Sequence, residues 1–259
     1  MTSAAALTGA LFSGAMKWAA ALSGALFSRT IPWTAALAGV CLISACASGP
    51  KPPDWQVEAK GAMERALAAY LEGNSRVEAA ELARARRELS RTGRPDILAT
   101  AELLHCAGRV ASLVFEPCAG FEMLRQDALA QQRAYADYLR GQLDPAAVAL
   151  LPEAQRAAAA GDANALKAVA DPLSQLVAAG VLLQTGKASP AVIEQAIATA
   201  SSQGWRRPLL AWLGVQLQRA EQGGDAQQAA RLRRRIEIVQ QAGALPPRQT
   251  PKDIAKDIQ

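Results

Sequence analysis

The sequence predicts an all-α protein. Alanine is abundant, aromatic residues make up only 5% of the chain, and no long stretch alternates Val, Ile or Thr with polar residues as a half-buried strand would. Helix-start signals recur along residues 54–242, and apolar residues follow them at helical spacing. We expect about ten helices, paired as antiparallel hairpins that begin near residues 54, 95, 144, 171 and 208.

The first hairpin is predicted from its caps and its apolar stripe. Asp54 can cap a helix that ends at Gly73-Asn74 and carries Ala59, Met63, Leu67 and Tyr70 on one face. Ser75-Arg76-Val77-Glu78 has the pattern of a capping box, in which the Ser75 hydroxyl and the Glu78 carboxylate each satisfy a free backbone N–H. The second helix is expected to stop near Gly93.

Proline marks the starts of the later helices, because a missing N–H costs nothing at a first helical position. The positions are Pro95, Pro145, Pro172, Pro190 and Pro208. Asp225-Ala226-Gln227-Gln228 opens the last long helix with a variant of the capping box. Residues 243–259 contain Pro246, Pro247 and Pro251, and we expect them to form a disordered tail.

Two stretches show local repeat features. One carries Tyr70, Gly73, Ala79, Ala80, Ala83 and Leu89, and the other carries Trp212-Leu213-Gly214 followed by Leu217, Gly224 and Ala229. Hairpins with small residues on facing sides resemble tetratricopeptide and related α-solenoid repeats. Gly73 comes one residue early, Trp212 abuts Leu213, and the hairpin starts follow no strict period. The resemblance implies a TPR-like stack, and an irregular helical bundle is the alternative.

Residues 1–45 have the features of a secretory signal peptide. Lys17 and Arg29 are the only charged residues before Cys46, and residues 31–45 are almost wholly apolar. That run is shorter than the roughly 20 residues of a spanning helix, although a longer tilted stretch could serve as an anchor. Residues 5–13 recur almost unchanged as residues 20–28, which indicates a duplicated signal segment or a translation start at Met16 rather than Met1.

Ile43-Ser44-Ala45-Cys46 resembles the lipobox of bacterial lipoproteins, in which an aliphatic residue and two small ones precede the cysteine that is acylated. Cys41 does not fit, because the branched Val40 precedes it. The resemblance implies an N-acyl diacylglyceryl Cys46, with palmitate-type chains, in a Gram-negative envelope. Residues 46–53 are rich in Pro and Gly and would act as a tether. An unmodified thiol in an ordinary signal core is the alternative.

Family knowledge of such lipoproteins also gives a location. Ala47 stands where an Asp would favour retention, so the outer membrane is expected, facing the periplasm, with the inner membrane as the alternative. Residues 54–74 and 102–124 are similar to uncharacterised envelope lipoproteins of Proteobacteria. That similarity implies helical pairs and brings no activity.

Cys106 and Cys118 are predicted to form a disulfide, because exported chains are oxidised and these two form an even pair. A continuous helix over residues 106–115 would carry its ends roughly 13 Å apart. A disulfide needs Cα atoms within about 7 Å. The chain must therefore double back at residues 115–117, or the helix must end near Gly108. Two buried thiols are the alternative, and His105 beside Cys106 does not have zinc-ligand spacing.

No catalytic residue, metal or cofactor is predicted. Adjacent side chains on a helix point about 100° apart, which prevents the hydrogen bond that a His105–Cys106 nucleophile would need. The carboxylates considered for a peptidoglycan-cleaving site are Glu58, Glu102, Glu116 and Glu122, and no motif singles one out.

The charge balance is mildly basic, with 28 Lys and Arg against 23 Asp and Glu, and does not indicate nucleic-acid binding. A candidate basic patch comprises Arg206, Arg207, Arg231, Arg233, Arg234 and Arg235. It could meet anionic lipid, peptidoglycan or an acidic partner, or it could be a solvated helix face.

These observations favour a lipid-anchored periplasmic protein that acts as an interaction scaffold or assembly adaptor. Its partner would be an envelope protein or peptide held in a groove lined by polar and apolar residues. The first alternative is a module that binds or modifies peptidoglycan, and the second is a structural lipoprotein without a dedicated ligand. Fold alone does not decide among them.

Overall fold

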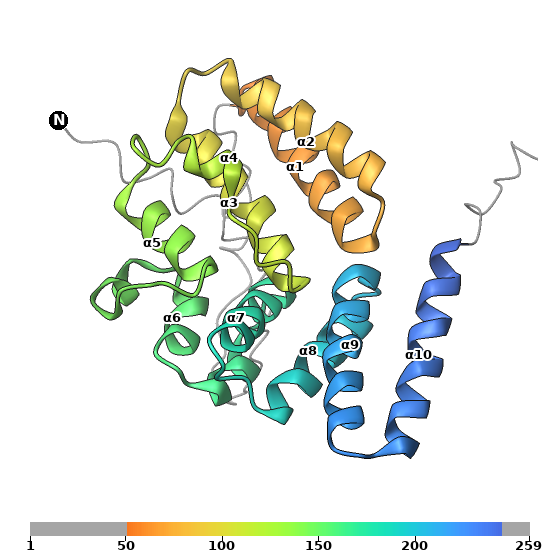
Figure 1. The fold of residues 1–259 in the computed structure, drawn as a ribbon. Coiled ribbons are helices and arrows are strands. Elements are labelled where there is room, and N and C mark those ends of the chain that lie inside the picture. Colours follow the sequence, from red (N-terminus) through yellow and green to blue (C-terminus); the bar gives the residue numbers. More distant parts are fainter. Residues whose placement is uncertain (1–50, 245–259) are drawn as a thin grey trace, which may run out of the picture. The chain divides into compact units, whose positions relative to one another are not determined.

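The computed structural model describes residues 51–244, and these residues are all helical or connecting, with no strand among them. The all-α prediction is confirmed (Figure 1). Cys46 and the predicted signal peptide lie outside the described residues, as do most of the tether and most of the C-terminal tail. Within the described part, the chain from Pro52 onward belongs to one compact unit.

Ten α-helices and two short 3-10 helices follow one another in this region. Their bounds are α1 Asp54–Glu72, α2 Ser75–Ser90, α3 Pro95–Ala111, α4 Ala119–Glu122, α5 Ala130–Leu139, η1 Pro145–Leu150, α6 Glu153–Ala159, η2 Ala163–Ala168, α7 Pro172–Gln184, α8 Pro190–Ser202, α9 Arg206–Gln222 and α10 Ala226–Ala244. The last helix extends slightly past the boundary at residue 242 that the sequence suggested.

The α1–α2 hairpin has its own small core. Gly73 ends α1 in the left-handed conformation, with φ of 88°, and this reverses the chain into α2. The facing sides pack mainly through alanine and leucine, and the buried members are Ala59, Ala62, Met63, Ala66, Leu82, Ala85 and Leu89, with Ala101 of α3. Small side chains let the two helices approach closely, as the sequence pattern suggested.

The predicted capping box at the start of α2 is wrong. Asn74 is the N-cap, and its side-chain oxygen accepts a hydrogen bond from the Val77 N–H at 3.2 Å. Ser75 is therefore already the first helical residue. Its hydroxyl and the Glu78 carboxylate are free to make tertiary contacts, which are described below.

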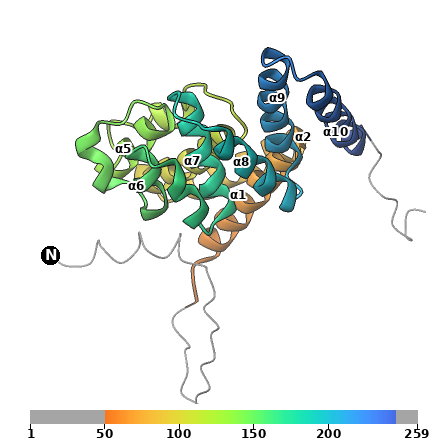
Figure 2. The ribbon, with the colours of Figure 1, turned by 90° about the horizontal axis from the view of Figure 1, so that it is seen from below.

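The larger core joins helices that are far apart in the sequence. α3 packs against both α5 and α7, α7 packs against α8, and α8 packs against α9 (Figures 1 and 2). At Gly180 a Cβ atom would lie 2.5 Å from the Val110 carbonyl oxygen, so glycine permits the close approach of α7 to α3. Trp212 of α9 is fully buried, and its indole N–H donates to the Ala111 carbonyl at 3.1 Å.

The C-terminal hairpin pairs α9 with α10, which packs through Ala229, Leu232, Ile236 and Val239. Hairpins therefore occur at both ends of the described chain, and the arrangement is compatible with either a helical bundle or a solenoid. None of the helices in residues 51–244 has the length and apolarity needed to cross a bilayer.

Candidate functional site

Two adjoining hollows lie between α8 and the α9–α10 hairpin, with volumes of about 450 and 320 Å³. Both are lined by Glu194 and Gln216, so they are parts of one surface groove, which we call the α8–α10 groove. The groove is open to solvent along its length. Its shape suits a segment of polypeptide better than an enclosed small molecule.

The local sequence explains which side of α8 forms one wall of the groove. The Ser189 hydroxyl accepts from the Val192 N–H, and Pro190 occupies the first turn, so the helix starts at a defined residue. Ile193 and Ile197 then fall on the buried side and lie beneath the groove, with only 1% and 5% of the two residues exposed. The accessible apolar surface of the groove comes from exposed residues such as Pro190 and Ala198. Ser201 and Ser202 add hydroxyl groups to the rim at one end.

The walls of the groove carry charged side chains of both signs. Glu194 projects from α8, and the other side carries Arg219 of α9, Arg235 of α10 and Asp225 between these helices. Gln216 of α9 adds an amide that can both donate and accept. The charged and amide groups of the two walls can bind the polar groups of a helical or extended segment.

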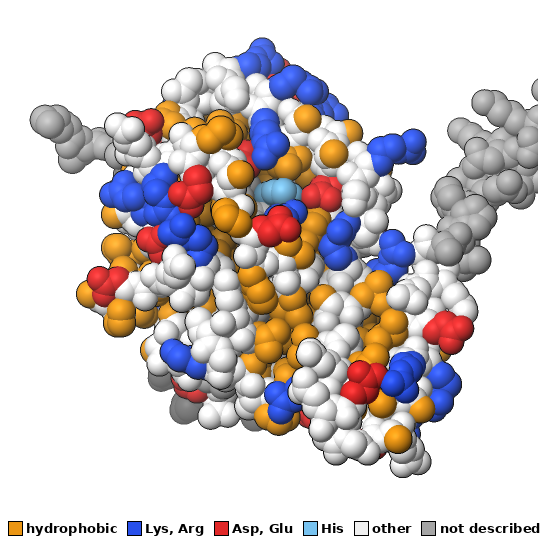
Figure 3. Space-filling view, viewed as in Figure 1, with side chains coloured by type: hydrophobic (Ala, Val, Ile, Leu, Met, Phe, Trp, Pro, Cys, Tyr) orange, Lys and Arg blue, Asp and Glu red, His pale blue; other side chains and the backbone are white. Residues whose placement is uncertain are grey.

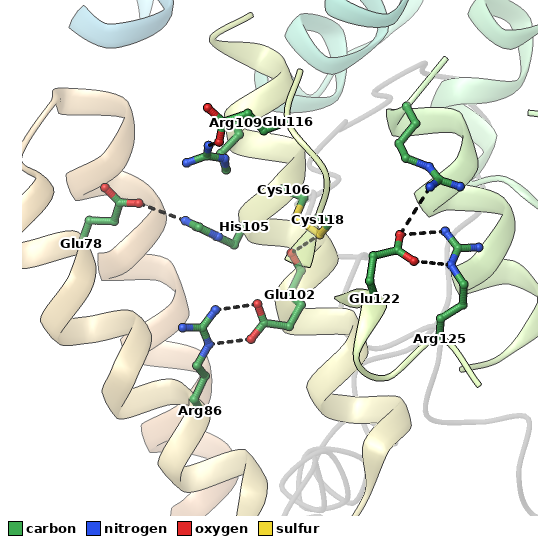
Figure 4. Close-up of a disulfide and its surroundings, with 11 residues drawn as sticks. Glu78, Arg86, Glu102, His105, Cys106, Arg109, Glu116, Cys118, Glu122 and Arg125 are labelled. Atoms are coloured by element: carbon green, nitrogen blue, oxygen red, sulfur yellow. Dashed lines mark hydrogen bonds and ion pairs between the residues drawn. A yellow bond between two sulfur atoms is a disulfide. The ribbon is translucent and has the colours of Figure 1, made fainter. Parts of the chain in front are cut away.

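A second polar feature lies where α1, α2, α3 and α9 meet, and we call it the polar junction. Its members are Tyr70, Ser75, Glu78, His105 and Arg207. The His105 Nε2 lies 2.9 Å from the Glu78 carboxylate, with only 16% and 13% of the two side chains exposed. Figure 3 shows the histidine at the surface among acidic side chains, and Figure 4 shows its contact with Glu78.

Arg207 connects α9 to the hairpin. Its Nε donates to the Tyr70 carbonyl at 2.7 Å, its Nη2 donates to the Ser75 hydroxyl at 2.9 Å, and the guanidinium lies 4.3 Å from the Tyr70 ring centroid. The second Glu78 oxygen is 4.0 Å from the guanidinium. Burial raises the pKa of the Tyr70 phenol, although Ser112 and the positive charge of Arg207 act in the opposite direction.

Every charged group at this junction has a partner, which is the pattern of a structural contact. His105 contacts the Glu78 carboxylate, and the adjacent Cys106 lies at disulfide distance from Cys118. Sequence analysis did not find the junction, because Tyr70 and Arg207 are separated by 137 positions. No local sequence pattern indicates a contact between residues so far apart.

The Cys106–Cys118 pair is confirmed, with Cα atoms 5.9 Å apart. α3 continues to Ala111, beyond the end near Gly108 that we had considered. Leu113 then adopts a φ of 61°, which is uncommon for a residue with a branched side chain, and the chain returns along α3 to Cys118. The helix therefore ends between the two positions considered, and the chain doubles back at Leu113 rather than at residues 115–117 (Figure 4).

The four carboxylates considered for a cleavage site each contact an arginine. The pairs are Glu58–Arg84, Glu102–Arg86, Glu116–Arg109 and Glu122–Arg125. Glu102 is buried and accepts from Arg86 at 2.6 and 2.7 Å (Figure 4). Arg125 lowers the pKa of Glu122, against the effect of burial. A general acid needs the opposite shift, so the surroundings of Glu122 do not fit that role.

The six arginines of the candidate basic patch have different surroundings. Arg206 and Arg207 donate to carbonyls at the C-terminal end of α1, where a cation is favoured by the helix dipole. Arg233 pairs with Glu221 at 2.5 Å, and Arg235 lines the groove. Arg231 and Arg234 are exposed on α10.

Within residues 51–244, no three His, Cys, Asp or Glu side chains gather as metal ligands would. Comparison with known proteins finds no family model, no curated protein and no solved structure that matches this chain.

Proposed function

We propose that this chain is a lipid-anchored cell-envelope protein that acts as a protein-interaction scaffold or assembly adaptor. The observation that carries the proposal is the α8–α10 groove, with exposed apolar residues at Pro190 and Ala198 and charged residues on both walls. Helix-in-groove recognition combines such features, because the apolar surface supplies buried area and the charged residues orient the bound segment. The partner would be a segment of an envelope protein.

Other observations support the envelope as the compartment. A disulfide-bonded pair is typical of chains that fold in an oxidising environment. The lipobox-like residues before Cys46 and the Pro/Gly-rich residues 46–53 would hold the helical unit close to the membrane. Ala47 favours the outer membrane over the inner membrane as the anchored surface, on the periplasmic side.

In-cell photo-crosslinking can test the groove directly. A photoreactive residue placed at Ala198 or Gln228, both exposed groove residues, should capture one discrete envelope protein. The matched controls are Ala83 on α2 and Gln240 on the other flank of α10, which are exposed and outside the groove. Mass spectrometry of the adducts would name the partner.

The role of the anchor is tested with Cys46→Ala in the same cells. Capture at Ala198 and Gln228 should fall, because the unanchored protein loses its local concentration near a membrane partner. Equal capture at groove and control positions, or adducts only with bulk porins or glycan, would contradict the scaffold. Turnover on purified peptidoglycan would favour the alternative of a peptidoglycan-modifying module.

A further inference from the structure

The outward face of α10 carries two arginines and an exposed isoleucine, with the acidic Glu237 at its edge. The residues that pack against α9 lie on one side of the helix, namely Ala229, Leu232, Ile236 and Val239. At 100° per residue, Arg231, Arg234 and Ile238 fall on the opposite side. Ile238 is 66% exposed, and Arg231 and Arg234 are also exposed. Among the described helices, α10 makes extensive contact with α9 alone.

The two arginines on this face differ from most arginines in the described residues because they have no carboxylate partner. Arg233, on the flank of α10, pairs with Glu221. Arg231 and Arg234 form no ion pair with any carboxylate in residues 51–244, so their charge is directed at solvent. Figure 3 shows basic side chains along the α10 edge of the molecule.

We propose that the outward face of α10, centred on Arg231, Arg234 and Ile238, binds the surface of an anionic membrane. Arginine pairs well with the phosphate oxygens of lipid headgroups, and it can reach them while its aliphatic stem lies over apolar surface. Ile238, one turn from Arg234 and two turns from Arg231, would enter the boundary between headgroups and acyl chains. Cationic residues around an exposed aliphatic side chain are the pattern of a helix that lies in the membrane interface.

The shape of this face favours a membrane surface over an acidic protein as its binding partner. The face is a convex helix surface, and neither of the two hollows of the α8–α10 groove is lined by Arg231, Arg234 or Ile238. An interfacial protein hot spot usually sits in a well-packed pocket, whereas a lipid surface adapts to a convex helix. The exposed Ile238 has a role at a lipid surface and no evident partner elsewhere.

Two arginines and one isoleucine give a weak contact on their own. The proposed lipid anchor would make that contact effective by keeping the face near the membrane, and the inference relies on the proposed function only for that proximity. Contact through the outward side of α10 would leave the groove on its flank accessible. The two proposals can therefore fail independently.

Vesicle sedimentation tests the inference without the anchor. Residues 52–259 are used alone, because the chain from Pro52 onward forms a compact unit with its own cores. The probes are phosphatidylcholine vesicles with and without phosphatidylglycerol, at low and high salt. We expect binding only to the anionic vesicles, and we expect salt to weaken it.

The decisive variants are Arg231→Gln with Arg234→Gln, and Ile238→Ser. Each arginine should raise the affinity for anionic vesicles about fivefold, so the double variant should bind these vesicles about 25-fold more weakly. Ile238→Ser should weaken binding with an unchanged salt dependence. The matched control is Arg76→Gln with Arg87→Gln on α2, which removes the same charge from exposed arginines and should bind as the parent does.

Three results would overturn the inference. They are no binding to anionic vesicles at low salt, an equal loss in the α2 control, and tighter binding to polyglutamate than to vesicles. The last would assign the face to an acidic protein. Circular dichroism would confirm that these exposed substitutions leave the helical fold intact.

Discussion

Arg207→Met should destabilise the helical unit by removing the contact between α9 and the α1–α2 hairpin. Methionine keeps most of the aliphatic stem and has good helix propensity, so the change in stability reports the loss of the guanidinium contacts. The variant loses the bonds to the Tyr70 carbonyl and the Ser75 hydroxyl and the contact with the Tyr70 ring. It also leaves Glu78 with His105 as its remaining partner.

The magnitude follows from the exposure of these groups. A hydrogen bond from a charged donor contributes about 1.5–3 kcal/mol when it is buried. The Arg207 side chain is 30% exposed, and the Tyr70 carbonyl keeps a second donor in the Gly73 N–H, so the lower end applies. With about 1 kcal/mol for the cation–π contact, and allowing for non-additivity, we expect a total loss of about 2–3 kcal/mol.

The assay is equilibrium urea unfolding of residues 52–259, followed by far-UV circular dichroism. Arg207→Lys should lose about half as much as Arg207→Met, since an ammonium can keep the cation–π contact but cannot make both bonds. Arg206→Met serves as the control, because Arg206 donates only to the Glu72 carbonyl. A loss below about 0.5 kcal/mol for Arg207→Met would refute the reasoning, since surface substitutions commonly fall in that range.

Two further predictions concern the disulfide and an ion pair. Replacing Cys106 and Cys118 together by Ser should cost about 3 kcal/mol in the loop-closure model, given their separation of 12 positions, and a reductant should produce the same loss in the parent but none in the variant. Arg125 lowers the pKa of Glu122 from its ordinary value of 4.5, so the stability from this pair is complete above that pH and is lost as the pH falls through the lower folded-state pKa. Arg125→Gln should flatten the acid side of the stability–pH profile measured by urea unfolding, and an unchanged profile would show that other carboxylates dominate it.

The sequence by itself determined features that depend on neighbouring residues. Pro95, Pro172 and Pro190 begin helices because a proline at the first turn loses no hydrogen bond. Asp225 accepts from the Gln228 N–H, as its position before the last helix predicted. The Cys106–Cys118 pair was also predictable, since two cysteines in an exported chain form an even pair in an oxidising compartment.

The tertiary structure alone decided which side chains meet. Ser75 and Glu78 have the spacing of a capping box, but Asn74 takes the cap and leaves both to contact α9 and α3. Arg206 and Arg207 belong to a basic run in the sequence, yet they bind carbonyls at the end of α1. The physical reason is distance along the chain. Local preferences act over a few residues, whereas these partners are brought together only when the apolar faces of the helices pack.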